Sequence, residues 1–459
     1  MNKNAAGFIA KSTIKAPDLD HRRKINFNIG KYNAAVPKGQ QQFTDLLSVR
    51  EKAKNIKWRA MEQLDTLLEQ FEKNITARGA KVLWAETAEQ ALAAIDAICQ
   101  EKNCTTVVKS KSMVTEEIHL NHFLAAKGIE SVETDLGEYI QQLDDEPPYH
   151  IVTPAMHKSK EDVAKLFADK LGVPSGLTPQ EITQVARQKL REKYIAAQIG
   201  ITGANFILPD IGGIALTENE GNARLTTAWP NTHIVIVGIE KVLPSVHDLP
   251  LFWPLLASFG TGQMVTVYNS IITGPRQPGE ANGPEDMYVI LLDNGRTNLL
   301  ANTKTREALY CIRCGACLNA CPVYKNIGGH SYDTTYSGPI GSVITPHLKG
   351  MKDYQHLSFA SSLCGNCTQV CPVRINLHEL LLENRHESVQ EGNSSLAERL
   401  AWKAWKTASL HRGMMNTGSG ALKTKMVQRL FKGWTTHRTP LQFSPKTFNE
   451  MWQQQQQPQ

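Results

Sequence analysis

Seven cysteines gathered in two short runs constrain this 459-residue chain more than any other feature. The first run is Cys311-Ile-Arg-Cys314-Gly-Ala-Cys317-Leu-Asn-Ala-Cys321-Pro322, and the second is Cys364-Gly-Asn-Cys367-Thr-Gln-Val-Cys371-Pro372. The remaining cysteines, Cys99 and Cys104, lie far from both runs, so nothing resembles the disulfide framework of a secreted protein. The pattern indicates a reducing compartment and an inorganic centre bound by thiolates.

The spacing of the two runs predicts iron–sulfur clusters. The first run has the C-x2-C-x2-C-x3-C-P spacing of bacterial two-cluster ferredoxins, in which the fourth cysteine of one run ligates the other cluster. Structural zinc is the alternative, because C-x2-C pairs also bind zinc, but two cross-paired runs that each end in Cys-Pro favour clusters. By the ferredoxin rule, we expect two 4Fe–4S clusters, one on Cys311, Cys314, Cys317 and Cys371 and the other on Cys321, Cys364 and Cys367.

The second expected cluster lacks a fourth cysteine, because Ser361 occupies that position of the register. Three arrangements stay open: a 4Fe–4S cube with an oxygen ligand such as Ser361, a cube with one iron open to solvent or substrate, and a 3Fe–4S cluster. An open iron could act as a Lewis acid on a hydroxy-carboxylate. A plain electron relay needs no such assumption and is favoured.

The residues before the cysteines predict an α/β domain. Residues 43–78 have the apolar spacing of one long amphipathic helix, and strand-like runs then alternate with capped helices, which predicts a parallel sheet. The short β-rich runs of residues 201–294 are expected to complete the same sheet. The long segment between the two cysteine runs is expected to be a loop that wraps the clusters or forms a docking surface. We predict an N-terminal arm with the amphipathic helix (1–70), an α/β domain (71–300), a small helical ferredoxin-like domain (301–390) and a helical C-terminal extension (391–459).

A segment rich in lysine and serine lies where one predicted strand ends and a helix begins. Helix N-terminal amides together with Lys109, Ser110, Lys111 and Ser112 could bind a carboxylate or phosphate. The alternative is a solvated strand end at which Ser112 only caps the helix. No nucleotide-binding fingerprint and no combination of nucleophile, histidine and acid can be assembled from the sequence, so the catalytic residues stay unknown.

The positive charge of the chain is concentrated at its end. Residues 401–459 contain nine Lys or Arg and one acid, Glu450, so this segment has a net charge of +8. The preceding 400 residues have a net charge of −2, which gives +6 for the whole chain. Four of the eight tryptophans (Trp402, Trp405, Trp434 and Trp452) lie in the same segment. Such a segment suits an acidic partner or an anionic membrane surface, or it is a solvated helical face whose tryptophans pack on a neighbouring domain.

No segment reaches the roughly 20 apolar residues of a membrane span, and the first residues do not form a signal peptide. We expect a cytoplasmic protein with no nucleic-acid partner. Association with the inner membrane surface through the basic segment is the alternative location.

Several segments resemble the lactate utilisation protein B (LutB) family. They are Val108–Glu117, Ile201–Phe206, Gly212–Gly221 and Gly274–Gly279, and they precede the cysteine runs in the same order and spacing as in that family. The resemblance implies a lactate-utilisation (LUD) domain related to the ribose-phosphate isomerase and CoA-transferase-like α/β fold, followed by a two-cluster ferredoxin-like domain and a C-terminal extension. It also implies three cysteine ligands for the second cluster.

The resemblance implies that this chain is the iron–sulfur electron-transfer subunit of a complex that oxidises L-lactate to pyruvate and allows growth on lactate. The implied partners are a cysteine-rich subunit and a second LUD protein, and the subunit that cleaves the C–H bond is left open. One alternative is an α/β-domain enzyme whose clusters are structural. Another is an electron-transfer subunit of a different hydroxy-acid oxidase that delivers electrons to quinone at the membrane.

Overall fold

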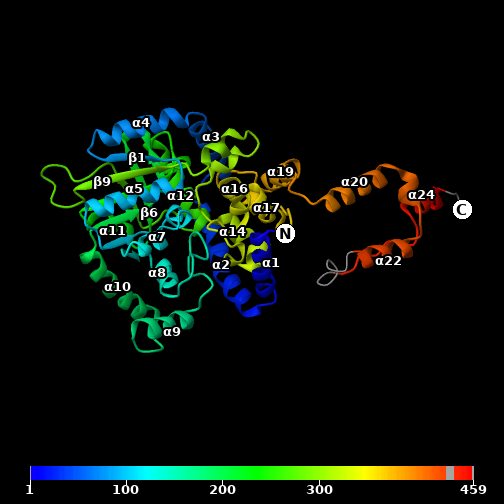
Figure 1. The fold of residues 1–459 in the computed structure, drawn as a ribbon, viewed down its shortest axis with the longest axis horizontal. Coiled ribbons are helices and arrows are strands. Elements are labelled where there is room, and N and C mark those ends of the chain that lie inside the picture. The colour runs from blue at the N-terminus through cyan, green and yellow to red at the C-terminus, as the bar shows by residue number, and fades with distance from the viewer. Residues whose placement is uncertain (1, 431–438, 457–459) are drawn as a thin grey trace. The chain divides into compact units, whose positions relative to one another are not determined.

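The computed structural model describes residues 2–430 and 439–456 (Figure 1). Contacts divide the chain into two compact units, Met1–Ser388 and Val389–Gln459. The first unit holds both cysteine runs, and it ends two residues before the predicted boundary at residue 390.

A six-stranded parallel sheet organises the first unit. Its strand order is β1-β9-β7-β4-β2-β3, and every neighbouring pair is parallel. The strands are β1 (Lys81–Ala85), β2 (Thr106–Lys109), β3 (Glu130–Glu133), β4 (Ile199–Thr202), β7 (Thr232–Gly238) and β9 (Asp286–Leu292). The central strand β7 is buried throughout, as expected for a parallel strand covered on both faces. The predicted α/β fold is confirmed.

Alternate residues of the sheet face two different hydrophobic cores. In β7, Ile234 and Ile236 pack into a core with α5 and α7, whereas Val235 and Val237 face the opposite side. That opposite core also contains the apolar residues of the N-terminal helices and the buried cysteines of both runs. One face of the sheet therefore supports the cysteine-bearing region directly.

A separate three-stranded antiparallel sheet corrects one prediction. The strands β5 (Phe206–Leu208), β6 (Gly213–Glu218) and β8 (Tyr268–Ile272) pair in the order β5-β6-β8 and do not continue the parallel sheet. The connection between β5 and β6 is the single turn η1 (Pro209–Ile211), which is too short for the crossover that parallel strands need. Gly212, at φ +60°, completes that turn.

The predicted helix at residues 43–78 is two helices, α3 (Leu46–Glu62) and α4 (Leu64–Thr76), which meet at Gln63 in a non-helical conformation (φ −121°, ψ 25°). The break lets both apolar faces reach the same core. The other helices that precede the first cysteine run are α1 (Lys3–Lys15), α2 (Leu19–Gln40), α5 (Ala88–Glu101), α6 (Met113–Glu117), α7 (Leu120–Ala126), α8 (Leu136–Leu143), α9 (Lys160–Leu171), α10 (Pro179–Ala196), α11 (Asn222–Ala228), α12 (Leu249–Gly260) and α13 (Arg296–Ala301), with the short turns η2 (Ile239–Lys241), η3 (Val246–Asp248) and η4 (Arg306–Tyr310).

The cysteine-bearing region is built from short helices. They are α14 (Ala316–Ala320), α15 (Pro322–Ile327), η5 (His330–Tyr332), α16 (Gly338–Lys349), α17 (Met351–Phe359), α18 (Asn366–Gln369) and α19 (Leu377–Gln390). The segment between the two runs was expected to be a loop, but it is mostly helical. Its small and apolar residues bury α16 from Gly338 to Pro346, and this packing outweighs the turn-forming tendency of the glycines and prolines.

The second unit is helical, as predicted, with α20 (Leu396–Leu410), α21 (Arg412–Asn416), α22 (Gly420–Leu430) and α24 (Phe448–Gln456). Within this unit, Trp402, Trp405 and Trp452 are exposed, and the ring of Trp452 stacks on that of Phe448. Trp434 lies outside the described residues. Among residues 2–430 and 439–456, no helix has both the length and the apolar character that crossing a membrane requires.

Candidate iron–sulfur centres

The first group of cysteines is assembled by left-handed turns around Cys314. Arg313 and Gly315 have φ values of +61° and +78°, so the chain curls between successive cysteines. A Cβ at Gly315 would lie 3.0 Å from atoms of His150 and Val152, so these side chains would have to shift to accept a larger residue. The left-handed conformation and the close neighbours both favour glycine here.

The fold brings Cys371 to the first run, as the ferredoxin rule predicts. The thiol of Cys314 interacts electrostatically with those of Cys311 and Cys371, and the thiol of Cys317 interacts with all three. Burial raises the pKa of Cys371 to about 12. Four thiols converging in a buried place suit an iron centre, because coordination keeps such thiols deprotonated where burial alone would not.

Backbone amides and cations surround this first group. The amides of Arg313 and Ile375 donate to the sulfurs of Cys311 and Cys371 at 3.4 and 3.3 Å. The Arg50 guanidinium donates to the backbone carbonyl of Cys371 at 3.0 Å from Nε and 2.7 Å from Nη2. Such donors and positive charges stabilise the extra electron of a reduced cluster.

Two buried lysines also lie near this group. Burial lowers the pKa of Lys57 to about 7 and that of Lys241 to about 8, and a Cys311 thiolate opposes the shift in both. The ammonium of Lys57 donates to the carbonyls of Glu240 and Val242 at 2.6 and 3.0 Å. The group therefore lies among several basic side chains.

The second group contains Cys321, Cys364 and Cys367. The thiol of Cys367 interacts electrostatically with those of Cys321 and Cys364, and burial raises its pKa to about 11. Cys364 is exposed, unlike any cysteine of the first group. The amide of Tyr324 donates to the Cys321 sulfur at 3.5 Å. The fold thus brings the cysteines together in the two sets expected from the sequence, and their role as cluster ligands stays a prediction.

The three cysteines of the second group line a small cavity. Its walls include Ser361, as expected from the register, and also Ser362 and His378. The hydroxyl of Ser361 accepts a hydrogen bond from the amide of Leu363 at 3.1 Å. Sequence reasoning missed His378, because it lies beyond Cys371 at the start of α19 and no ferredoxin spacing includes it.

Cys99 and Cys104 take no part in either group. They interact with each other within the core formed by α5 and β2, on the face of the sheet opposite the cysteine runs. Both are buried in that core.

The ammonium of Lys109 is buried and already paired. It lies 2.7 Å from the Glu133 carboxylate, 3.1 Å from the Glu116 carboxylate and 2.8 Å from the hydroxyl of Thr115. These two carboxylates neutralise the charge that the anion-site prediction assigned to Lys109.

The other residues of that segment point to separate partners. Lys111 donates to the carbonyl of Val152 at 2.6 Å, and the side chain of Ser112 caps α6. Ser110 is buried, with its amide bonded to the Ile201 carbonyl at 2.9 Å. The four residues do not converge on one opening, so their contacts favour the capping interpretation.

A cavity of about 840 Å³ lies between the α/β part and the cysteine-bearing region of the first unit. Sequence reasoning missed it, because its walls come from residues scattered between Lys11 and Tyr354. Glu138 lines it, and burial raises the pKa of this carboxyl well above its usual range, with the neighbouring Glu133 carboxylate adding to the shift. A protonated Glu138 could share its hydrogen with Glu133.

A parallel α/β domain that packs against a helical region with two convergent cysteine groups defines an iron–sulfur protein. Three family models agree with this class and match consecutive parts of the chain: an LUD domain over residues 68–292, a 4Fe–4S dicluster domain over 307–375 and the C-terminal domain of lactate utilisation protein B over 383–457.

Curated relatives specify the family. A lactate utilization protein B from Bacillus licheniformis is 46% identical over 81% of this chain and 78% of its own length, and one from Bacillus subtilis is 45% identical over the same shares. An Escherichia coli K12 protein, described as the uncharacterized electron transport protein YkgF, is 44% identical over 80% of this chain and 78% of its own. The chain belongs to the lactate utilization protein B family, which confirms the resemblance noted from the sequence.

Proposed function

We propose that this chain is the electron-transfer subunit of a complex that oxidises L-lactate to pyruvate and so allows growth on lactate. The observation that carries the proposal is the convergence of Cys371 with Cys311, Cys314 and Cys317, because that cross-pairing builds two-cluster electron carriers. The names of the relatives, which refer to lactate utilization and electron transport, support it.

Two clusters are proposed, each with its own ligands. The first, a 4Fe–4S cluster, takes Cys311, Cys314, Cys317 and Cys371. The second takes Cys321, Cys364 and Cys367, and its fourth position is filled by Ser361, left open, or absent in a 3Fe–4S cluster. When bound, the clusters supply one-electron redox chemistry. At the first site, the protein buries three of the four cysteines and surrounds the group with amide donors and basic side chains. At the second site, Cys364 is exposed to solvent.

The proposed partners are a cysteine-rich subunit and a second LUD protein, in the cytoplasm or at the inner membrane surface. The uncovered Trp402 and Trp405 on α20, together with the basic residues around them, support a docking role for the second unit. Removing residues 401–459 should weaken partner or vesicle binding while the iron content stays the same.

The function is tested by anaerobic purification of the full chain and by lactate-dependent dye reduction with and without the two partners. We expect iron, acid-labile sulfide and reducible EPR signals in this chain, with dye reduction only in the complex. Zinc without sulfide would contradict the proposal, and dye reduction by the isolated chain would move the oxidation chemistry onto it.

A second candidate function is an enzyme active site in the cavity that Glu138 lines, with the clusters only structural. The buried Glu133 and Glu138 carboxyls favour it, because burial raises the pKa of both and strongly perturbed pKa values are typical of functional sites. Clusters that keep their oxidation state in the presence of lactate and partners would support this candidate over electron transfer.

A further inference from the structure

Two histidines and a glutamate form a compact group away from the cysteine runs. Among residues 2–430 and 439–456, one ligand atom from each of Glu146, His157 and His330 lies within 4.8 Å of the other two. Glu146 and His157 belong to the segment between α8 and α9, and His330 begins η5 in the cysteine-bearing region. The group therefore joins two parts of the first unit that are far apart in the sequence.

The surroundings of His330 fix which ring nitrogen is available. Its Nε2 lies 2.8 Å from the backbone carbonyl of Pro147. A carbonyl oxygen can only accept, so Nε2 carries the hydrogen and Nδ1 keeps its lone pair. Metal-bound histidines are held in the same way, with the second nitrogen donating to a carbonyl or carboxylate.

The ring of His157 is also held in place. It stacks on Tyr149 with ring centroids 4.4 Å apart, and the Tyr149 hydroxyl is bonded to Nε2 of His21 at 2.8 Å. The Nε2 of His157 lies 3.0 Å from Glu146 Oε2, while its buried Nδ1 has no hydrogen-bond partner. Because Nε2 faces the Glu146 carboxylate, it is the His157 nitrogen placed to share an ion with Glu146.

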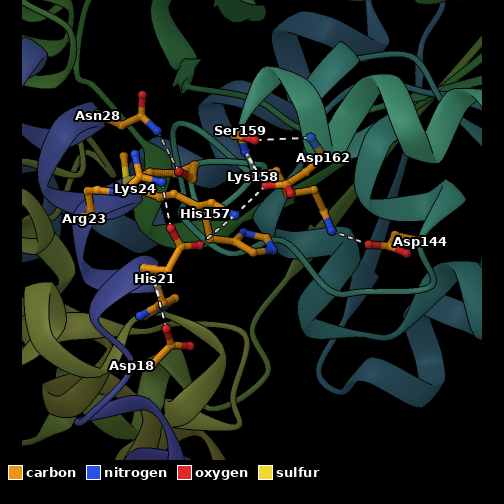
Figure 2. Close-up of polar contacts among 12 residues, drawn as sticks. Asp18, His21, Arg23, Lys24, Asn28, Asp144, His157, Lys158, Ser159 and Asp162 are labelled. Carbon is orange, nitrogen blue, oxygen red and sulfur yellow. Dashed lines mark hydrogen bonds and ion pairs between the residues drawn. The ribbon is translucent and has the colours of Figure 1, made fainter. Parts of the chain in front are cut away.

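A lysine also contacts this group. The ammonium of Lys158 lies 3.0 Å from Glu146 Oε2, and it is paired as well with Asp144, as the dashed line in Figure 2 shows. Because Asp144 is a second anionic partner, the charge of Lys158 remains compensated when the Glu146 carboxylate binds a metal ion instead. Lys158 does not preclude a bound metal.

We propose that Glu146, His157 and His330 bind one divalent transition-metal ion of the zinc type. Two imidazoles and one carboxylate suit zinc, and three protein ligands leave a fourth coordination position for water or a small oxygen ligand. Glu146 and His330 also line the cavity between the α/β part and the cysteine-bearing region. The bound ion ties these two parts together, and this inference does not depend on the proposed electron-transfer function.

The test uses the full chain with its clusters reconstituted anaerobically, so that the cysteines cannot bind the probe. After incubation with zinc chloride and desalting, we expect about one zinc per chain by mass spectrometry, and at least tenfold weaker binding in the double variant H157A/H330A. Zinc should raise the melting temperature of the wild type and not that of the double variant.

The matched control is H119Q/H122Q, which removes a second histidine pair in the wall of the same cavity, with ring centroids 6.5 Å apart. It should bind zinc like the wild type. The variant E146Q keeps the size of the side chain and serves as the test if H157A/H330A loses its iron and sulfide. The proposed site would be contradicted if E146Q bound as much zinc as the wild type, or if H119Q/H122Q lost as much zinc binding as H157A/H330A.

Discussion

The two cysteine groups share a motif but differ in their surroundings. The first has four cysteines, three of them buried, and lies among basic side chains and amide donors. The second has three cysteines, one of them exposed, and a cavity lined by serines and a histidine. The reduction potential and the reactivity of an iron–sulfur cluster depend on the burial, charge and hydrogen bonding around its sulfurs. The proposed first cluster is therefore enclosed, and the proposed second cluster is accessible to a partner or a ligand.

The largest expected effect comes from removing one ligand of each group. C314S replaces a buried ligand, so we expect loss of the first cluster, roughly half of the iron, and a clear fall in thermal stability. C364S replaces an exposed ligand and should remove the second cluster with a smaller loss of stability. Iron, sulfide and melting temperature check both variants. Equal stability losses would break the distinction between an enclosed and an accessible site.

The variant S361C tests the vacant position of the second group directly. A thiolate in the ferredoxin register should complete an all-cysteine 4Fe–4S cluster, which we expect to resist oxidation by air or ferricyanide better than the wild-type cluster does. S362C is the control on the same cavity wall. If S361C leaves the EPR spectrum and the oxidation rate unchanged, Ser361 does not adjoin the fourth position.

Two glycines at equivalent places in the runs provide a matched pair. Gly315 and Gly365 each follow a cysteine and have φ values of +78° and +80°, so G315A and G365A both incur about 1–2 kcal/mol of backbone strain. Only at Gly315 would the new Cβ meet close neighbours, at 3.0 Å, whereas nothing lies within 4 Å of a Cβ at Gly365. G315A should therefore lower the melting temperature more than G365A does. The reverse order would show that the first group is not the more tightly packed.

The smallest expected effect concerns the charge near the first group. R50Q removes a guanidinium that donates to the Cys371 carbonyl, and it should lower the reduction potential of the first cluster by tens of millivolts, equivalent to roughly 1–2 kcal/mol. The control is K304Q, which removes an exposed lysine paired with Glu383. A shift of the same size in K304Q would mean that the local charge does not tune the first site.

Much of this organisation could be predicted from the sequence, because cysteine spacing and strand–helix alternation are local signals. The ligand groups and the parallel sheet follow from them. The sequence did not predict the separate antiparallel sheet, because the paired residues of β6 and β8 are at least 50 positions apart. The anion site at Lys109 was expected because the sequence does not show that Glu116 and Glu133 close over its ammonium. The position of His378 beside the second cysteine group, and the cluster of Glu146, His157 and His330, could be recognised only in the folded structure.

The most direct test of two unlike clusters in one chain is an EPR-monitored redox titration of the anaerobically purified full-length protein. The account predicts two signals with separate midpoint potentials, one lost in C314S and the other in C364S, and only the latter altered in S361C. A single signal, or two signals that both disappear in either cysteine variant while the protein stays folded, would contradict it.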